Sequence, residues 1–208
     1  MAMQQFLAAQ LRKPQGWFGS LVMSRILNRV NGKIVDATLA LLNVKPEHEV
    51  LESGFGGGSA VRWLAKRASS GVITGVDISP EMVQRAERQF HTEIQSGRVK
   101  VQLGDVAHLP FGDSAFDRVF TVNTIYFWPD TKQGLAEIYR VLRLDGIAAI
   151  SIRSREKMEK RGVTKHNFRL FSADEVAGFM RAAGFRNVSI NHRDRDRAWD
   201  QAIIVGAR

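Results

Sequence analysis

The sequence contains no cysteine and no long apolar run. Without cysteine, disulfides, thiolate nucleophiles and cysteine metal sites are excluded, and we expect no metal site. No stretch approaches the ~18 consecutive apolar residues that a membrane-spanning helix needs. Residues 1–15 also lack the apolar core and the cleavage site of a signal peptide. We therefore expect a cytoplasmic protein without a membrane span.

Internal repeats, low-complexity segments and blocks of five like charges are absent as well. No stretch alternates basic and aromatic residues as a single-strand nucleic-acid groove would. The net charge is nevertheless +9. Residues 1–45 carry about +5, residues 46–152 about −2 and residues 153–208 about +6. The basic excess on the two ends could hold an acidic small molecule, an anionic membrane or nucleic acid, or could simply maintain solubility.

The length and composition fit one globular domain with a sizeable core. The chain has 208 residues, of which 44% are hydrophobic and 25% charged. Apolar residues recur at helical spacing from Trp17 to Leu42, with a break expected near Asn31-Gly32. We expect these helices to form an N-terminal cap over residues 1–45, followed by a single compact unit over residues 46–208.

A glycine-rich turn follows the first apolar run of that unit. The sequence Val50-Leu51-Glu52-Ser53-Gly54-Phe55-Gly56-Gly57-Gly58 predicts a buried strand and a tight turn, and Ser59 begins a helix. Glycine permits positive φ and allows a ligand to approach the backbone closely. The N–H groups in the first turn of a helix have no partner within the helix and can bind a phosphate or carboxylate. A dinucleotide fingerprint would need glycine at position 59. The Glu52 carboxylate would also repel a diphosphate and tolerate a cationic ligand.

The later strands that we predict also end in polar residues. The apolar run 72–77 closes on Asp77, about 25 residues beyond Glu52, near the spacing at which an acidic residue meets ribose hydroxyls. Two more runs close on Asp105 and Asn123. Ligands of open α/β sheets bind beyond the carboxyl ends of the strands. We therefore expect these four side chains to face one ligand.

Three aromatic residues follow Asn123 and cannot all face the core. We expect Tyr126 to line the pocket, where its hydroxyl could orient a substrate and its ring could stabilise a cation. Phe127 and Trp128 are expected in the core.

The remaining chain predicts a helix, a strand, a loop, a second helix and a closing strand pair. The helix covers residues 134–142 and the strand residues 146–152, while residues 153–171 have the polar character of a loop or lid. Ser172 and Glu175 predict a capping box at the second helix. Residues 188–191 and 202–206 then predict an antiparallel pair.

The pattern Glu52-x-Gly54-x-Gly56-x-Gly58 resembles the first motif of the class I S-adenosylmethionine-dependent methyltransferases. Gly104-Asp105-Val106 matches the segment of that family that contacts adenine, and the resemblance covers roughly residues 46–206. It is most similar to the small-molecule enzymes of the ubiquinone and menaquinone biosynthesis type. Arg140–Gly146 departs from the family's Arg-Val-Leu-Lys-Pro-Gly-Gly turn by lacking its proline and first glycine, which affects a structural turn only.

The resemblance implies a fold, a cofactor and a set of residues. The fold is α/β, with a Rossmann-like, seven-stranded, mostly parallel sheet, an antiparallel last strand, helices on both faces and an N-terminal helical cap. The cofactor is S-adenosyl-L-methionine and its product S-adenosyl-L-homocysteine. The expected cofactor-binding residues are Glu52, Gly54, Gly56, Gly58, Asp77, Ile78, Asp105, Val106 and Asn123. The expected substrate pocket contains Trp17, Phe18, Tyr126 and Phe168.

Methyl transfer from a sulfonium requires mainly alignment of a nucleophile and exclusion of water, so no catalytic triad is expected. Tyr126 and His166 are the candidate catalytic residues, to orient or deprotonate the acceptor. The aromatic pocket residues suit a flat or apolar small molecule, and basic residues such as Arg153 and Arg155 suit one bearing a carboxylate or phosphate. The protein is expected to be a monomer or a homodimer.

Two alternatives stay open. A nucleic-acid base methyltransferase is suggested by the charge and by Asn123-Thr124-Ile125-Tyr126, which keeps the outer residues of an Asn-Pro-Pro-Tyr motif but not its prolines. Since no separate recognition domain is visible, nucleic acid is not the expected partner. The second alternative is a non-catalytic, cofactor-binding regulatory module. Ser59 and Glu52 disfavour a nicotinamide-dependent dehydrogenase.

Overall fold

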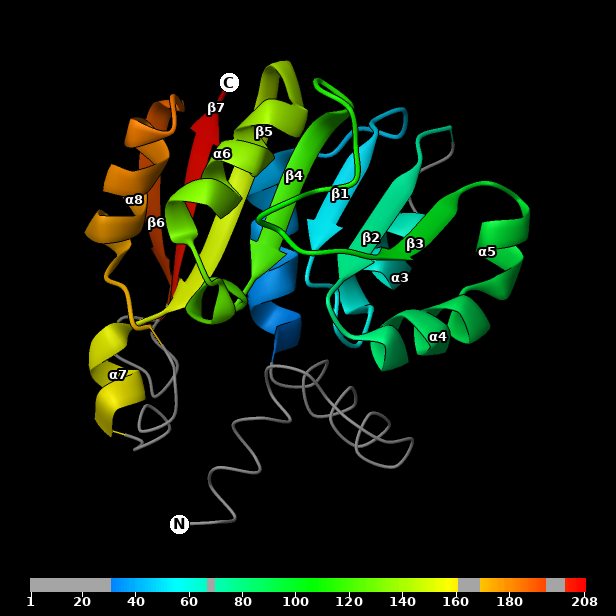
Figure 1. Ribbon diagram of the computed structural model, residues 1–208, viewed down its shortest axis with the longest axis horizontal. Coiled ribbons are helices and arrows are strands. Elements are labelled where there is room, and N and C mark those ends of the chain that lie inside the picture. Colours follow the sequence, from blue (N-terminus) through cyan, green and yellow to red (C-terminus); the bar gives the residue numbers. More distant parts are fainter. Residues whose placement is uncertain (1–30, 67–69, 161–168, 194–200) are drawn as a thin grey trace.

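The computed structural model describes residues 31–66, 70–160, 169–193 and 201–208 (Figure 1). Within these residues, seven strands form one sheet in the order β3-β2-β1-β4-β5-β7-β6. Strands β1 to β5 pair in parallel, and β7 is antiparallel to both of its neighbours. This confirms the predicted mostly parallel sheet with an antiparallel last strand. The strands are β1 (Val50–Ser53), β2 (Ile73–Asp77), β3 (Val99–Leu103), β4 (Phe116–Val122), β5 (Leu142–Arg153), β6 (Arg186–Arg193) and β7 (Gln201–Ala207).

Helices cover both faces of the sheet, as expected. In Figure 1, α6 and α8 lie in front of the sheet and the helix over residues 31–42 lies behind it. The α3 and α4 helices pack on the same face as the helix over residues 31–42. The described helices are that helix, α3 (Ser59–Ala65), α4 (Pro80–Gln89), α5 (His91–Gln95), the 3-10 turn η1 (Ile125–Phe127), α6 (Thr131–Val141), α7 (Arg155–Lys160) and α8 (Ala173–Ala182).

Local sequence signals explain where several helices begin. The Ser79 hydroxyl accepts from the Met82 N–H, and Pro80 occupies the first turn of α4. The predicted capping box is confirmed, because the Ser172 hydroxyl accepts from the Glu175 N–H and the Glu175 carboxylate accepts from the Ser172 N–H. These caps fix the entry of the chain into α4 and α8.

Two apolar cores lie on the two faces of the sheet. The core under α6 and α8 contains Leu135, Ile138, Val176, Met180 and Ile204, and the opposite core contains Ile34, Leu42, Leu64, Phe120 and Ile203. Burial of one such side chain contributes roughly 1.5–3 kcal/mol. These cores keep the strands in register and so place their carboxyl ends side by side.

The helix over residues 31–42 is part of the opposite core. The Thr38 and Ser151 hydroxyls form a buried hydrogen bond of 2.6 Å, and the Arg118 Nε donates to the Leu42 carbonyl at 2.7 Å. Asn31 and Gly32 themselves are helical, and since the residues before them lie outside the described part of the chain, a helix break near this position stays a prediction. Tertiary packing outweighs the roughly 1 kcal/mol that glycine costs a helix. The division of the chain at residue 45 stays a prediction.

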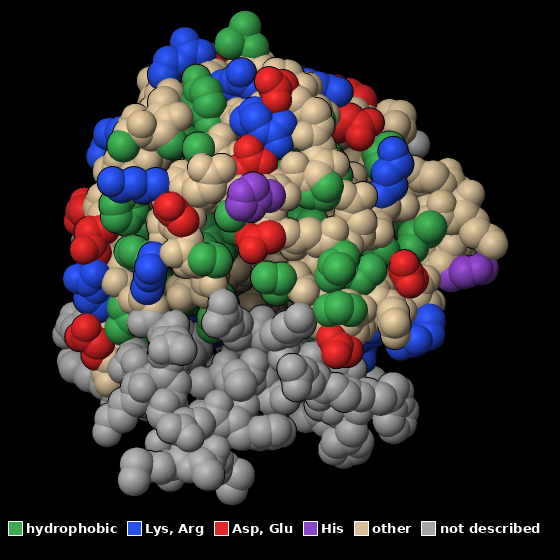
Figure 2. Space-filling view, in the orientation of Figure 1, with side chains coloured by type: hydrophobic (Ala, Val, Ile, Leu, Met, Phe, Trp, Pro, Cys, Tyr) green, Lys and Arg blue, Asp and Glu red, His purple; other side chains and the backbone are tan. Residues whose placement is uncertain are grey.

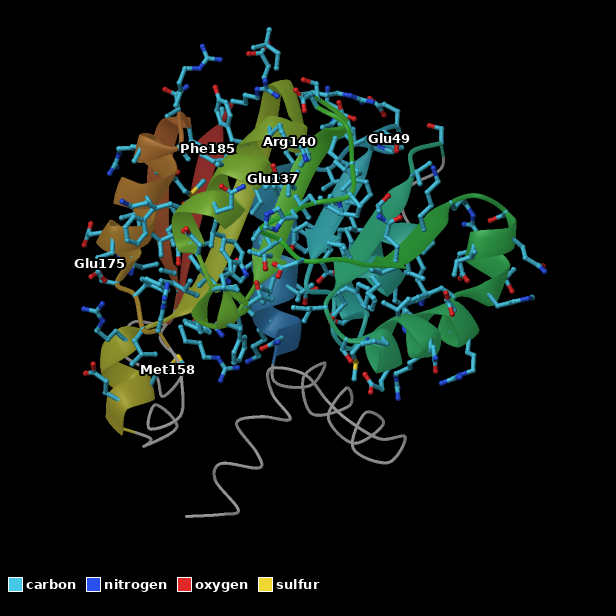
Figure 3. All side chains as sticks on the ribbon, in the orientation of Figure 1. Glu49, Glu137, Arg140, Met158, Glu175 and Phe185 are labelled. Carbon is cyan, nitrogen blue, oxygen red and sulfur yellow. The ribbon has the colours of Figure 1, made fainter. Side chains whose placement is uncertain are left out.

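The connections after β4 differ from the prediction in their bounds. Strand β5 begins at Leu142, directly after α6, rather than at residue 146. Asp145 lies within this extension at φ 63°, where the family's turn has a glycine. The α7 helix occupies part of the segment expected to be a loop. In Figure 3, Met158 of α7 lies close to the start of α8, and an Arg155–Glu175 ion pair of 2.6 Å joins the two helices.

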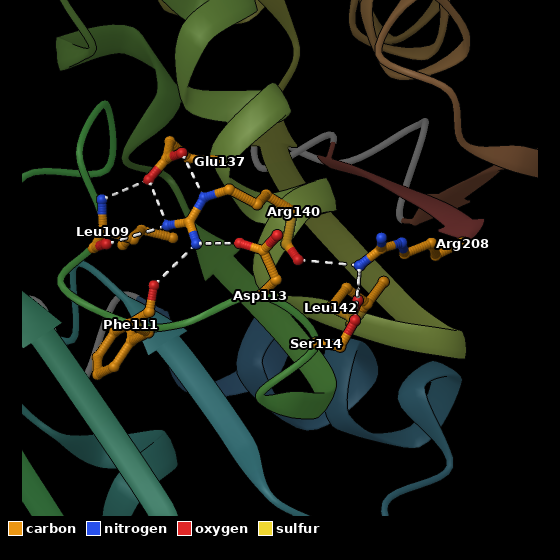
Figure 4. Close-up of polar contacts among 8 residues, drawn as sticks. All are labelled: Leu109, Phe111, Asp113, Ser114, Glu137, Arg140, Leu142 and Arg208. Atoms are coloured by element: carbon orange, nitrogen blue, oxygen red, sulfur yellow. Dashed lines mark hydrogen bonds and ion pairs between the residues drawn. The ribbon is translucent and has the colours of Figure 1, made fainter.

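A network of arginine contacts fixes the edge of the sheet at which β5 starts and β7 ends (Figure 4). The Arg140 guanidinium pairs with Glu137 at 2.7 Å and with Asp113 at 2.8 Å. Arg208, the last residue, donates to the Arg140 and Leu142 carbonyls. Arginine can satisfy several acceptors in one plane. The network therefore stabilises the edge opposite the predicted site.

Candidate functional site

The glycine turn after β1 adopts the conformation that its sequence predicts. Gly54, Gly56 and Gly58 have φ values of 75°, 49° and 70°, a region that glycine enters without strain. A Cβ on Gly54 would lie 2.5 Å from the Thr124 Cγ2, and one on Gly58 would lie 2.8 Å from the Phe90 ring. Both glycines are therefore required by packing against η1 and α4 as well as by backbone conformation.

Asp77 ends β2 and holds this turn. Its carboxylate accepts from the Gly56 N–H at 2.8 Å and from the Ser79 N–H at 3.0 Å. The side chain is buried, at 8% exposure. Burial raises the pKa of Asp77, while the hydrogen bonds from the Ser79 and Gly56 backbone oppose this rise. The residue expected to bind ribose thus also connects two strand ends.

Glu52, the residue before the last of β1, is buried, at 4% exposure. The Val61 N–H, in the first turn of α3, donates to the Glu52 carboxyl group. The Oε2 atom has no hydrogen-bond partner among the described residues. Burial, and then the charge of Asp77, raises the pKa of Glu52 well above its usual range. A buried carboxyl oxygen without a partner beside a second carboxylate fits a cationic or hydrogen-bond-donating ligand.

The ends of β2 and β3 provide apolar surface near these carboxylates. Ile78 is 43% exposed, and Leu103, which pairs with Asp77 in the sheet, is 54% exposed. The Asp105 carboxylate accepts from the Ala107 N–H at 2.9 Å, and Val106 is buried. Sequence reasoning named three of these residues but missed Leu103. The signal that could have identified Leu103 as a site residue is a large apolar side chain at the last position of a strand.

Asn123 follows β4 in the left-handed region, at φ 58°. Its N–H donates to the Ser151 carbonyl at 2.9 Å. Its side chain donates to the Asn31 Oδ1 at 3.0 Å and accepts from the Tyr126 hydroxyl at 3.3 Å. Non-glycine residues at such φ are uncommon and occur often at functional sites. The structure therefore places the fourth predicted strand-end residue at the same edge of the sheet, under conformational constraint.

Tyr126 is more buried than the sequence suggested, at 3% exposure, and packs in the core under α6 and α8. Its hydroxyl accepts from the Arg153 N–H. Burial raises the pKa of the Tyr126 phenol. A phenol that stays protonated at neutral pH is suited to orient a neighbour rather than to abstract a proton. Trp128 is buried, as predicted for a core residue, whereas Phe127 is only half-buried against the same core.

Four of the predicted residues lie outside the described residues: His166, Trp17, Phe18 and Phe168. Their roles stay predictions. Arg155, proposed to favour an anionic acceptor, donates through Nη2 to the Glu175 carboxylate and to the Leu170 carbonyl. Part of its positive charge is therefore already paired.

Comparison with known proteins adds to this geometry. A family model described as a methyltransferase domain matches residues 51–150, from β1 into β5. An uncharacterized methyltransferase, YdaC of Bacillus subtilis, is 28% identical over 174 residues, or 84% of this chain and 91% of the relative. The ubiquinone/menaquinone biosynthesis C-methyltransferase UbiE of Geotalea daltonii is 33% identical over 130 residues. This match covers 60% of this chain and 55% of that relative, so the chain spans about half of its length.

Solved structures share the fold. A methyltransferase in complex with the Haloferax volcanii Trm112 methyltransferase activator superposes with a TM-score of 0.77 at 23% identity, covering 88% of this chain and 92% of that one. A SAM-dependent methyltransferase from Aquifex aeolicus gives a TM-score of 0.70 at 21% identity, covering 83% and 88%. The glycine turn and the unpaired Glu52 oxygen fit the cofactor of these enzymes, which carries positive charge on sulfur and on its amino group. The chain is a class I S-adenosylmethionine-dependent methyltransferase.

Proposed function

We propose that this methyltransferase acts in the cytoplasm on a small-molecule acceptor by in-line displacement. The bound cofactor supplies a methyl group on a positively charged sulfur, which needs no further activation. The protein contributes alignment of the acceptor and exclusion of water. The observation that carries the proposal is the convergence of Glu52, Asp77 and Asn123 on one edge of the sheet, around the glycine turn.

The described residues have distinct roles in this proposal. Glu52 binds the cationic amino-acid part of the cofactor, because its buried oxygen needs a donor. Asp77 accepts from the ribose hydroxyls while it holds Gly56. Ile78 and Leu103 provide apolar contact for the adenine ring, beside Asp105 and Val106. Gly54, Gly56 and Gly58 keep the backbone close to the cofactor.

The methyl end of the site is assigned to Asn123 and its neighbours. We propose that Tyr126 acts on the acceptor by positioning Asn123, since its hydroxyl donates to Asn123 and is buried. His166 remains the candidate to orient or deprotonate the acceptor, and Trp17, Phe18 and Phe168 remain candidates to line the substrate pocket; these four residues lie outside the described part of the chain. A general base is needed only where the acceptor carries a proton of high pKa.

Several observations support a small-molecule acceptor. A cavity of 290 Å³ lies beside the end of β5, with Ile152 and Ala202 in its lining and with charged residues of both signs, including Arg155 and Asp174. Its volume is at the lower limit for small-ligand sites, and none of the predicted cofactor-binding residues lines it, so it agrees with a small acceptor only through its position at the end of β5. The UbiE relative is named for ubiquinone and menaquinone biosynthesis, which agrees with an apolar acceptor.

The face shown in Figure 2 gives no support to a nucleic-acid substrate. On that face, Lys and Arg side chains are interspersed with Asp and Glu among the described residues, without a continuous basic stripe. Nucleic-acid binding relies on clustered positive charge. Among the described residues, none of the helices has both the length and the apolar character needed to cross a membrane.

The test is transfer of label from methyl-labelled cofactor in an extract separated into small-molecule, nucleic-acid and protein fractions. We expect label in the small-molecule fraction, and none with a Gly54→Val variant that still folds. Label confined to the nucleic-acid fraction would contradict the proposed acceptor. Cofactor binding without transfer to any fraction would favour a regulatory module.

A further inference from the structure

Four residues form a closed ring of hydrogen bonds at the carboxyl ends of β4 and β5. The Asn31 Oδ1 accepts from the Asn123 Nδ2 at 3.0 Å and from the Arg153 Nη2 at 3.1 Å. The Asn123 Oδ1 accepts from the Tyr126 hydroxyl at 3.3 Å, and that hydroxyl accepts from the Arg153 N–H. The ring joins the helix over residues 31–42 to η1 and to both strand ends.

The ring restrains a residue whose backbone is already unusual. Asn123 has φ 58°, its N–H is bonded to Ser151 of β5, and both polar atoms of its side chain are used within the ring. A non-glycine residue in this region costs about 1 kcal/mol and persists where its surroundings determine it. Thr124, the next residue, packs against Gly54 of the glycine turn. The position of Asn123 is thereby tied to the cofactor-binding turn.

Anchoring of the helix does not require this ring. Ile34, Val35 and Leu42 are buried in the core beneath the sheet, and the Thr38–Ser151 hydrogen bond lies about two helical turns beyond Asn31. The ring is only partly buried and lies at the strand ends, where ligands of α/β sheets bind. Polar networks of this kind restrain the orientation of the side chains that they join. What Asn31 adds is the orientation of Asn123 and Arg153.

We propose that Asn31 is a positioning residue for methyl transfer, which fixes Asn123 and Arg153 at the methyl end of the site. The inference rests on the proposed function, because it takes Asn123 as a cofactor-binding residue. Asn31 only accepts hydrogen bonds within the ring, through one oxygen. A carboxylate of the same shape retains this role, and a methyl side chain does not.

The first experiment compares Asn31→Ala, Asn31→Asp and the matched control Lys33→Ala, an exposed residue on the same helix. Calorimetry with S-adenosylhomocysteine gives the Kd, and thermal unfolding gives the Tm. We expect Asn31→Ala to weaken binding about tenfold. Asn31→Asp should remain within about threefold of the wild type, and Lys33→Ala should be unchanged. Equal Kd values for the wild type and Asn31→Ala would overturn the inference.

The second experiment separates positioning from a general loss of stability. Asn123→Gly removes the side chain while tolerating the positive φ, so it should fold. If Asn31 acts through Asn123, adding Asn31→Ala to Asn123→Gly changes the Kd by less than about twofold. The same tenfold loss in both backgrounds would show that Asn31 acts by another route and would overturn the inference. A wild-type protein that binds no cofactor would instead contradict the proposed function.

Discussion

The Asp77 carboxylate accepts a hydrogen bond from the Gly56 N–H at 2.8 Å, so the end of β2 holds the turn that follows β1. Parallel neighbouring strands place their carboxyl ends at one edge of the sheet, which makes this contact between residues 21 positions apart possible. The acidic residue therefore supports the shape of the site in addition to its proposed contact with ribose.

Two substitutions of Asp77 should weaken cofactor binding to different degrees. Asp77→Asn keeps one oxygen for the Gly56 N–H but removes the charge, and Asp77→Ala removes both. We expect losses of roughly 1–3 kcal/mol in binding free energy, larger for Ala, because charge-assisted hydrogen bonds are lost. Calorimetry with S-adenosylhomocysteine measures this, with Asp36→Ala, an exposed carboxylate, as control. Unchanged affinity in both Asp77 variants would remove the ribose assignment.

Glu52 should make the stability of the cofactor-free protein depend on pH. Its pKa in the folded state lies above the ordinary 4.5, so folding favours the protonated form. The contribution to stability is full below the ordinary pKa and is lost as pH rises through the raised one. The Tm of Glu52→Gln relative to the wild type should therefore increase as pH rises above about 5. Glu87→Gln, at an exposed position, is the control. A Tm difference that does not change with pH would contradict this.

The same Glu52→Gln variant should bind the cofactor about tenfold more weakly, since a neutral amide replaces the charge that faces the ligand. Calorimetry at pH 8 is the measurement. A gain in stability together with a loss in affinity would separate the ligand-binding role of Glu52 from a structural one. Equal or tighter binding would argue against a cation near Oε2.

Gly54→Ala should lower both stability and cofactor affinity. The new Cβ would lie 2.5 Å from the Thr124 Cγ2, and φ 75° disfavours any side chain. We expect roughly 1–3 kcal/mol of destabilisation from strain at one residue, measured by denaturant unfolding. Adding Thr124→Ser removes the clashing methyl group and should restore part of the loss. No rescue by Thr124→Ser would show that backbone strain alone accounts for the effect.

Asp145→Gly should stabilise the protein without affecting the site. Asp145 has φ 63° in the extension of β5, and its side chain is 87% exposed with one ion pair to Arg186 at 3.8 Å. Glycine adopts this φ without strain, and the substitution removes only an exposed ion pair. We therefore expect the free energy of unfolding to rise by about 0.5–1 kcal/mol, with unchanged cofactor affinity. Asp145→Ala keeps the strain and serves as the control. A loss of stability with Gly would show that the ion pair matters more than φ.

The sequence predicted the sheet and its strand ends because each apolar run closes on a polar residue, as Asp77 and Asn123 do. It predicted the capping box of α8 from Ser172 and Glu175, since that signal is local. It missed the early start of β5, because pairing across the sheet extends the strand through a residue of poor strand propensity, Asp145. Tertiary contacts override local preference at such positions.

The polar contacts between distant segments were not predictable from the sequence. Nothing in the pattern around Asn31 links it to Asn123 or Arg153, which lie 92 and 122 positions away. The burial of Tyr126 likewise depends on the packing of η1 against the core under α6 and α8. Motif reasoning finds residues of the right chemical type, and the folded chain decides which of them meet.

Calorimetric titration of the wild-type protein with S-adenosylhomocysteine tests the central claim, that the strand ends around the glycine turn form one cofactor site. We predict one site per chain, with a Kd on the order of micromolar, abolished in Gly54→Val and weakened in Asp77→Ala. Absence of binding, or binding that survives both substitutions, would contradict the account.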